Sequence, residues 1–352
     1  MPSGKWRVRW RDDFGNLRQQ SFDTKRAAQN YSAQVTTLKA SGSTGSLTAG
    51  RTPLGDIAAL CKTRRWEHKE PATANRYVRT WNLHIAPYLG AVPVERIRAA
   101  TIEDWQIRLK ADGVGADGRR RALSLLRSIL ARAVEWEYVS VNRAIGVPMP
   151  PRDEKRSVRP VSPSQVEAIV GQMEREQDRQ LVRLLAYAGL RPGEALALTS
   201  DRVKASTLLI EQANANGRIK PTKTRKVRSV ELLPPLAASL KSWLMESGTR
   251  GLLFPRFDGE PWTETDYRNW CRRIFTPAAP SGVTPYTLRH SFASLLIHAG
   301  EPVTYVASQL GHAPSMTLDT YAHVFADLQR GETFDPAQVI AEAMQTELRG
   351  MA

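Results

Sequence analysis

Residues 310–325, LGHAPSMTLDTYAHVF, concentrate side chains that can move protons or attack an electrophile. They hold two of the six histidines, with Tyr321 between His312 and His323. The pattern predicts a helix that ends at Gly311 and a second helical element that carries the tyrosine. Such a tyrosine either packs against a core or is a nucleophile. A phenol has a pKa of about 10, so attack at pH 7 needs its proton removed during bond formation or nearby positive charge.

A second segment places an arginine between two predicted helices. In YAGLRPGEALAL (187–198), one helix ends at Gly189 and the next begins at Pro192, which leaves Arg191 in the turn. Glu194 follows one turn later and can hold the guanidinium. Taken alone, this arginine is more typical of a surface loop.

A third segment, TPYTLRHSFASLLIHAG (284–300), predicts a helix with Tyr286 and Arg289 three residues apart on one face. His290 follows directly, and alone it is typical of a structural histidine. Between the second and third segments, GRIKPTKTRKVRS (217–229) has no acidic residue and lies between two predicted strands. Its six basic residues are Arg218, Lys220, Lys223, Arg225, Lys226 and Arg228. Such density suits a β-turn that enters a nucleic-acid groove.

The overall charge also points to a polyanion. The 352 residues carry a formal net charge of +15, and 41% are hydrophobic, as in globular proteins. No signal peptide, membrane-spanning run or nucleotide-binding glycine motif is present. Cys61 and Cys271 lack metal-ligand spacing, so a cytoplasmic protein without metal or other cofactor is expected.

The first 45 residues predict a small three-stranded sheet backed by one helix. In KWRVRWRDDFGNLRQQSF (5–22), residues alternate between an apolar face and a face of arginines that includes Arg7 and Arg9. The apolar face is formed by Trp6, Val8 and Trp10. The arginine face is either solvated or part of a DNA-reading module.

Two linkers, SGSTGSLTAGRTP (41–53) and VPMPPRDEKRSVRPVSP (147–163), separate three predicted domains. Residues 53–147 predict an all-α domain, and residues 160–352 predict a mainly α domain with a small antiparallel sheet and a C-terminal amphipathic helix. The expected class is therefore multidomain α+β. In the all-α domain, Arg119, Arg120 and Arg121 either begin a solvated helix or bind phosphate.

The three reactive segments together resemble the conserved boxes of the tyrosine recombinases, and within them the phage-type integrases. AGLRPGEALAL is similar to the first arginine box, TPYTLRHSFAS to the second, and LGHAPSMTLDTYAHV to the nucleophile box. The nine-residue step from His312 to Tyr321 is the family's usual one. The resemblance is close over residues 164–325. It extends more loosely to residues 53–147, as a core-site-binding domain, and to the N-terminal sheet, as an arm-site-binding module.

The resemblance implies a role for each reactive residue. Tyr321 attacks a DNA phosphodiester, Arg191 and Arg289 grip its non-bridging oxygens, and His312 donates a hydrogen bond to the phosphate or assists proton transfer. Lys223 protonates the departing 5′ oxygen, although Lys220 and Lys226 remain alternatives. Glu194 and His290 are supporting residues. Guanidiniums suit a phosphate because they stay charged and offer paired donors. The covalent phosphotyrosine stores the broken bond, so rejoining needs no cofactor.

One position departs from the family. Three residues before the second arginine the family most often has histidine, whereas this chain has Tyr286. A phenol can donate a hydrogen bond to a phosphoryl oxygen, but near neutral pH it is not a ready base. The expected reading is an active enzyme with a substituted donor.

The resemblance also implies partners. These are double-stranded DNA attachment sites, a homotetramer on DNA, and DNA-bending and excision accessory proteins, with nucleoid association when the protein is bound to DNA. Arg7, Arg9, Arg119, Arg120, Lys220 and Arg225 are the expected DNA contacts.

Two alternatives use the same residues differently. A non-enzymatic regulator would use residues 302–324 as a helix-turn-helix, with Gly311 in the turn and Thr317 to His323 on the recognition helix. A type IB topoisomerase would share the chemistry but need neither paired sites nor an arm module. A covalent adduct with nicked or suicide DNA separates the regulator from the enzymes.

Overall fold

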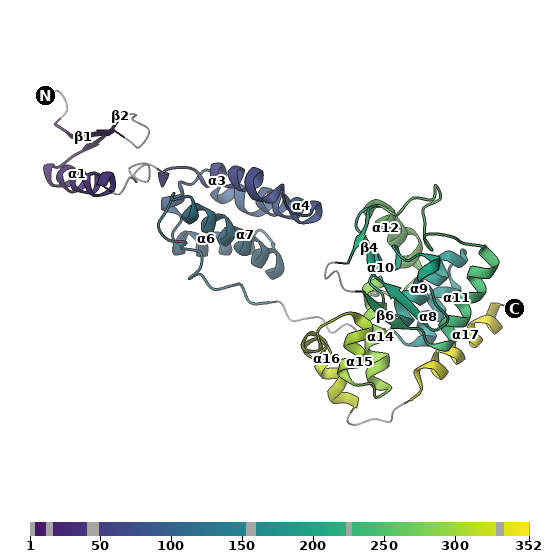
Figure 1. The fold of residues 1–352 in the computed structure, drawn as a ribbon. Helices are drawn as coiled ribbons and strands as arrows, with labels where there is room; N and C mark the ends of the chain where they lie inside the picture. The colour runs from purple at the N-terminus through teal and green to yellow at the C-terminus, as the bar shows by residue number, and fades with distance from the viewer. Residues whose placement is uncertain are drawn as a thin grey trace. The chain divides into compact units, whose positions relative to one another are not determined.

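The computed structural model describes residues 4–11, 17–40, 49–152, 160–222, 227–328 and 334–351. The chain divides into two compact units, Met1–Arg156 and Ser157–Ala352 (Figure 1). A mainly helical chain with small antiparallel sheets confirms the predicted class in outline. The finer boundaries at 1–45, 53–147 and 160–352 stay predictions.

The first unit begins with an antiparallel pair of strands, β1 (Trp6–Arg11) and β2 (Leu17–Phe22), next to helix α1 (Lys25–Ala40). Trp10 is buried and its ring meets Tyr31 of α1 edge-on, with 5.4 Å between ring centroids. Arg7 and Arg9 are exposed on the opposite face, as the alternation predicts.

Two details of this sheet differ from the prediction. Residues 4–11 and 17–40 contain two strands, so the predicted third strand is not confirmed. Trp6 was expected to face inward but is half exposed, because it pairs with Phe22 at the open end of the ribbon. The Nζ of Lys25 instead lies 5.5 Å from the Trp6 ring centroid.

The rest of the first unit is helical. Its elements are α3 (Leu54–Cys61), η1 (Lys62–Trp66), α4 (Pro71–Thr80), η2 (Trp81–Ile85), α5 (Ala86–Leu89), η3 (Val94–Arg96), α6 (Ala99–Ala111) and α7 (Ala116–Glu135). Apolar residues at helical spacing on α7, from Leu123 to Ala133, are buried in a core shared with α3 and α6.

Arg119 and Arg120, predicted DNA contacts, are partly buried near the start of α7. Arg119 Nε donates to the Val114 carbonyl at 3.1 Å, and the Arg120 guanidinium donates to the Pro150 carbonyl. Both side chains therefore bind backbone within the first unit, and their contact with DNA stays a prediction.

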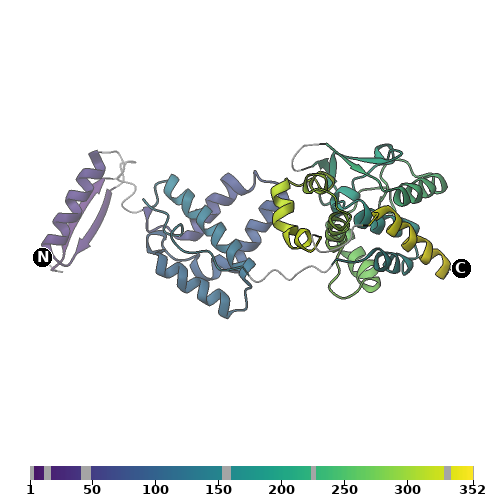
Figure 2. The same cartoon turned by 90° about the horizontal axis from the view of Figure 1, so that it is seen from below.

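The second unit surrounds two small antiparallel sheets with helices (Figures 1 and 2). β3 (Thr207–Ile210) pairs with β6 (Arg228–Glu231), and β4 (Gln212–Asn214) pairs with β5 (Ile219–Pro221). The basic segment 217–229 is therefore not one turn, because it contains β5 and the start of β6.

The helices of this unit place the reactive segments. They are α8 (Pro163–Gly171), α9 (Glu176–Tyr187), α10 (Pro192–Ala195), η4 (Ser200–Arg202), α11 (Pro234–Ser247), α12 (Glu264–Trp270), η5 (Cys271–Phe275), α13 (Thr276–Ala278), α14 (Pro285–His298), α15 (Val303–Leu310), α16 (Pro314–Leu328) and α17 (Pro336–Met351). α14 contacts α9, α15 and α16, so it joins all three reactive segments. α17 packs on α8 and α11, with Ile340 fully buried (Figure 1).

Candidate active site

Arg191 lies in the turn between α9 and α10, and the conformation of this turn is set by Gly189 before it and Pro192 after it. Gly189 has φ +60°, and a Cβ there would overlap Cδ1 of Phe292 on α14. Pro192 then begins α10, which makes Arg191 the N-cap residue. The turn is therefore fixed from both sides, and Arg191 NH2 lies 3.5 Å from the Gly311 carbonyl that follows α15.

Glu194 is a buried carboxylate that binds two arginines. One oxygen accepts from Arg191 NH1 at 2.8 Å, and the other accepts from the backbone N–H of Arg191 at 2.9 Å. Arg228 NH1 and NH2 bind the same two oxygens at 2.9 and 2.7 Å. Burial alone would raise the pKa of Glu194, but the hydrogen bonds and charges of Arg228 and Arg191 lower it to about 2.

Arg228 is a site residue to which sequence reasoning gave no role of its own. It lies on β6, and its Nε also donates to the Gln309 carbonyl at 3.3 Å near the end of α15. The signal available in the sequence was its place where a basic segment becomes an alternating strand.

Arg289 is buried on α14, with 3% of its surface exposed. Its guanidinium donates to the carbonyls of Gly189 and Leu310, which end two other helical segments. The nearest Glu194 oxygen is 3.9 Å away. Burial, with the charge of Arg191, lowers the pKa of Arg289 to about 9, so the group is still cationic at pH 7.

His312 follows Gly311, which ends α15 in the left-handed conformation at φ +63°. Its Nε2 lies 3.0 Å from Arg289 NH2 and accepts a hydrogen bond, because a guanidinium can only donate. Nδ1 is buried and has no partner among the residues that the structure describes. Burial, followed by the charges of Arg289, Arg191 and Arg228, lowers the pKa of His312 to about 4. The ring is thus neutral at pH 7.

Tyr321 lies inside α16 at a break in the helix, with φ −117° and ψ 16°. Its side chain is 3% exposed and packs with Phe292, Leu296 and Leu310. Its hydroxyl is 2.7 Å from Nδ1 of His290 on α14. Burial raises the pKa of Tyr321 to about 12, although the charge of Arg289 opposes the rise. The phenol is therefore protonated at pH 7.

The charges around this site do not balance. Arg191, Arg228 and Arg289 converge from three segments, whereas Glu194 is the carboxylate that binds them. This group therefore has two more positive charges than negative ones. A buried surplus of that kind favours an anion with several acceptor oxygens, such as a phosphodiester.

Comparison with known proteins identifies the family. The model of the Phage integrase family matches residues 160–327, which contain every residue of this site. The tyrosine recombinase XerC of Rhodospirillum centenum is 25% identical over 293 residues, covering 76% of this chain and 83% of the relative. XerD of Vibrio cholerae is 25% identical over 240 residues, or 65% and 77% of the two chains.

The chain belongs to the tyrosine recombinase family. It is a tyrosine-type site-specific recombinase, as the family resemblance implied.

Solved structures of recombinases share the fold. The Tn1549 transposon integrase in complex with a circular intermediate DNA superposes with a TM-score of 0.66 at 19% identity, covering 79% of this chain and 99% of that one. A lambda integrase dimer bound to a COC′ core site gives a TM-score of 0.62 at 16% identity, with 95% and 97% covered.

Not every predicted residue of this recombinase joins the cluster. Tyr286, in the first turn of α14, is 53% exposed. Lys220 lies on β5, opposite Ala213. Lys223, Arg225 and Lys226 fall outside the described residues. The roles of all five stay predictions.

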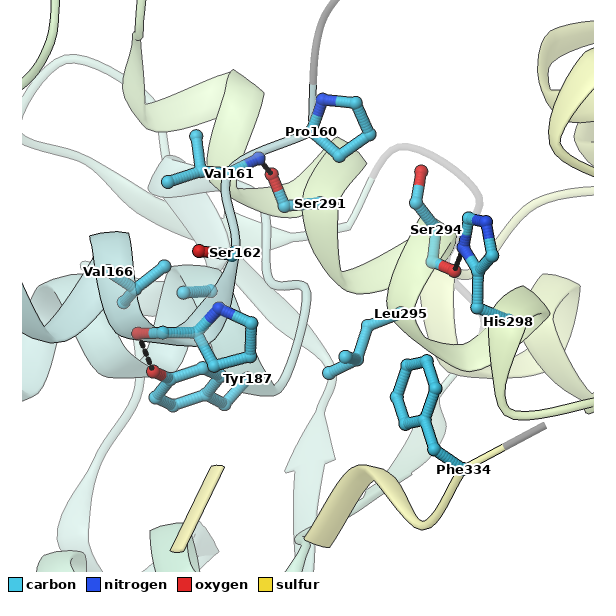
Figure 3. Close-up of a pocket in the computed structure, with 12 residues that line it drawn as sticks. Pro160, Val161, Ser162, Val166, Tyr187, Ser291, Ser294, Leu295, His298 and Phe334 are labelled. Carbon is cyan, nitrogen blue, oxygen red and sulfur yellow. Dashed lines mark hydrogen bonds between the residues drawn. The ribbon is translucent and has the colours of Figure 1, made fainter. Parts of the chain in front are cut away.

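A separate pocket of about 290 Å³ lies along α14 (Figure 3), and Arg289 is not among the residues that line it. Ser291, Ser294, Leu295 and His298 line it from α14. Tyr187 closes another side and donates to the Pro163 carbonyl at 3.2 Å. Serine and apolar side chains predominate, so this pocket lacks the paired cations of the recombinase site.

In the described part of the chain, no group of three or more histidine, cysteine or carboxylate residues is arranged to hold a metal ion. Over the same residues, every helix is too short or too polar to span a bilayer.

Proposed function

We propose that this recombinase integrates or excises a phage or other mobile DNA element, with a 3′-phosphotyrosine at Tyr321 as the intermediate. The observation that carries the residue assignment is the convergence of Arg191, Arg289 and His312 from three segments beside a buried tyrosine. In-line phosphoryl transfer depends mainly on positioning and charge stabilisation, which is what such a cluster supplies.

Arg191 and Arg289 bind the two non-bridging oxygens of the scissile phosphate. Their backbone contacts to Gly311, Gly189 and Leu310 fix their position before DNA arrives. Removing one such donor typically lowers the rate by about 100- to 1000-fold. Glu194, which is itself bound by Arg228, holds Arg191 through two hydrogen bonds.

Proton transfer uses separate groups at the two ends of the reaction. Lys223 protonates the departing 5′ oxygen, with Lys220 and Lys226 as alternatives. His312 donates a hydrogen bond to the phosphate or assists proton transfer. Because Nε2 accepts from Arg289, the neutral ring has its hydrogen on Nδ1.

The partners follow from the charge and from relatives that have been solved with DNA. A lambda integrase tetramer is known on a Holliday junction, and we assign a tetramer on DNA to this chain as well. Residues 53–147 bind core sites, whereas the arginine face of β1 binds arm sites through Arg7 and Arg9. Accessory proteins bend the DNA and set the direction of recombination.

The helix-turn-helix alternative leaves the cation cluster without a role. A regulator that only binds DNA has no use for Arg191 and a buried Arg289 held beside His312, whereas a phosphoryl-transfer enzyme does. Thr317, the first residue of the recognition helix in that alternative, is also fully buried.

A suicide DNA substrate, which releases a short 5′ fragment after cleavage, tests the proposal. We expect the wild-type protein to form a covalent adduct and Tyr321→Phe to bind the same DNA without forming one. Phenylalanine fills almost the same volume, so folding is preserved. An adduct that persists in Tyr321→Phe would place the nucleophile elsewhere, and no adduct in the wild type would contradict the enzyme assignment.

A further inference from the structure

His290 is the polar side chain in contact with the nucleophile. Its Nδ1 lies 2.7 Å from the Tyr321 hydroxyl, and the two ring centroids are 5.7 Å apart. The contact joins α14 to α16 across 31 positions of the sequence. We propose that His290 accepts the proton of Tyr321 as the phenolic oxygen attacks the scissile phosphorus. This inference rests on the proposed function, and it assigns that reaction's general base.

The need for such a base follows from Tyr286. The position where a histidine would be expected has a phenol, which cannot take up a proton near neutral pH. That phenol is also 53% exposed, whereas Tyr321 is buried. A nucleophile enclosed by protein needs a proton acceptor within hydrogen-bond distance, and His290 meets that condition in the structure.

The surroundings of His290 keep its ring neutral, so that Nδ1 can accept a proton. The titratable and charged groups that face it are Arg289 on α14, Tyr321 on α16 and His312 after α15. Burial, followed by the charge of Arg289, lowers the pKa of His290, so the ring is neutral at pH 7. A neutral ring with its hydrogen on Nε2 presents a lone pair at Nδ1 to the protonated phenol.

The proton balance of the step is complete. The Tyr321 oxygen forms a bond to phosphorus, the bond from phosphorus to the 5′ oxygen breaks, and the phenolic proton moves to Nδ1 of His290. The 5′ oxygen takes its proton from Lys223, the donor already proposed. In the rejoining step, the DNA 5′ oxygen forms a bond to phosphorus as its hydroxyl proton returns to Lys223, the bond from phosphorus to the Tyr321 oxygen breaks, and the His290 imidazolium returns its proton to that oxygen. Arg289, beside the imidazolium, makes its charged state short-lived and favours this return.

The decisive variant is His290→Gln, studied in single-turnover cleavage of suicide DNA by the full chain. Glutamine keeps a hydrogen-bonding group near Tyr321 but cannot take up a proton. We expect DNA binding to be unchanged and the cleavage rate to fall by about 100-fold or more, the usual contribution of a general base. His298→Gln is the matched control on the same helix, because His298 lies at the separate pocket and its Nδ1 donates to the Ser294 carbonyl at 2.8 Å (Figure 3). We expect this control to cleave at the wild-type rate.

The pH profile distinguishes a base from a packing residue. We expect the wild-type rate to be level between about pH 7 and pH 9 and to fall in acid as His290 becomes protonated. The His290→Gln rate is expected to rise by about tenfold per pH unit over the same range, because the tyrosinate must then form before attack. Imidazole added to His290→Ala should restore part of the rate.

A 5′-bridging phosphorothiolate substrate separates the base from the acid, because a thiolate leaves without protonation. We expect this substrate to restore cleavage by Lys223→Ala but not by His290→Gln. Rescue of His290→Gln, a wild-type rate in that variant, or a slower rate with the wild-type pH profile would each overturn the inference. Failure of the proposed function would look different, because the wild type would then form no adduct at Tyr321.

Discussion

Glutamine at position 194 removes the negative charge that holds two arginines in place. The Glu194 oxygens accept two hydrogen bonds from Arg228 and two from Arg191. Glu194→Gln keeps the volume but puts an NH2 group where a guanidinium already donates, so at least one arginine loses its partner. Breaking a buried ion pair in this way costs about 3–5 kcal/mol of unfolding free energy.

The pKa of Glu194 gives a second estimate of the unfolding free energy that its negative charge contributes. It falls from the ordinary 4.5 to about 2, which corresponds to about 3 kcal/mol. Because the folded pKa lies below the unfolded one, this stabilisation is complete above about pH 5 and is lost as the pH falls towards 2. By about pH 4, about 1 kcal/mol of it has disappeared. The stability gap between wild type and Glu194→Gln should therefore narrow in acid.

Urea unfolding followed by tryptophan fluorescence measures this gap between about pH 4 and pH 8. Single-turnover cleavage should fall on the order of 100-fold, because Arg191 is no longer held against the phosphate. Glu167→Gln is the matched control, since Glu167 is a buried acid that accepts from Arg183 at 2.6 and 3.0 Å but lies on α8. We expect this control to lose stability and keep its cleavage rate. A Glu194→Gln protein that behaves like the control, or a gap that does not narrow by pH 4, would refute the reasoning.

Two further outcomes are expected. Gly189→Ala should lower stability by about 2–4 kcal/mol and reduce cleavage, because a Cβ at φ +60° meets Phe292 and displaces the Arg191 turn. Thermal unfolding and suicide-substrate cleavage measure both effects, and an unchanged melting temperature would contradict them. Removal of residues 1–50 should spare cleavage at core sites but impair integration on DNA that has arm sites. Equal integration by the truncated chain would remove the arm-binding assignment.

The sequence predicts the site best where a reactive side chain lies next to a glycine or proline that ends or begins a helix. Gly189 and Pro192 predict the turn that carries Arg191, and the structure has that turn. The family assignment from the three boxes is also confirmed. These features are local, so spacing along the chain is enough to reveal them.

The sequence could not show contacts that depend on the packing of distant elements. Arg228 meets Glu194 across 34 positions, because β6 pairs with β3 and lies beside α15. His290 was classed as a supporting residue, because periodicity within α14 does not say which helix covers that face. The prediction that Trp6 faces inward is wrong for a similar reason, because strand alternation does not reveal where the two-stranded sheet ends.

The interruption of α16 at Tyr321 fixes the direction of the nucleophile. Thr317 before the break and Val324 after it are both buried, so each half of the helix is anchored in the core. A change of φ or ψ at Tyr321 would pivot one half of the helix against the other and disrupt the packing of one of them. The bend is therefore held from both ends, and the hydroxyl has little orientational freedom left to lose when a phosphate arrives.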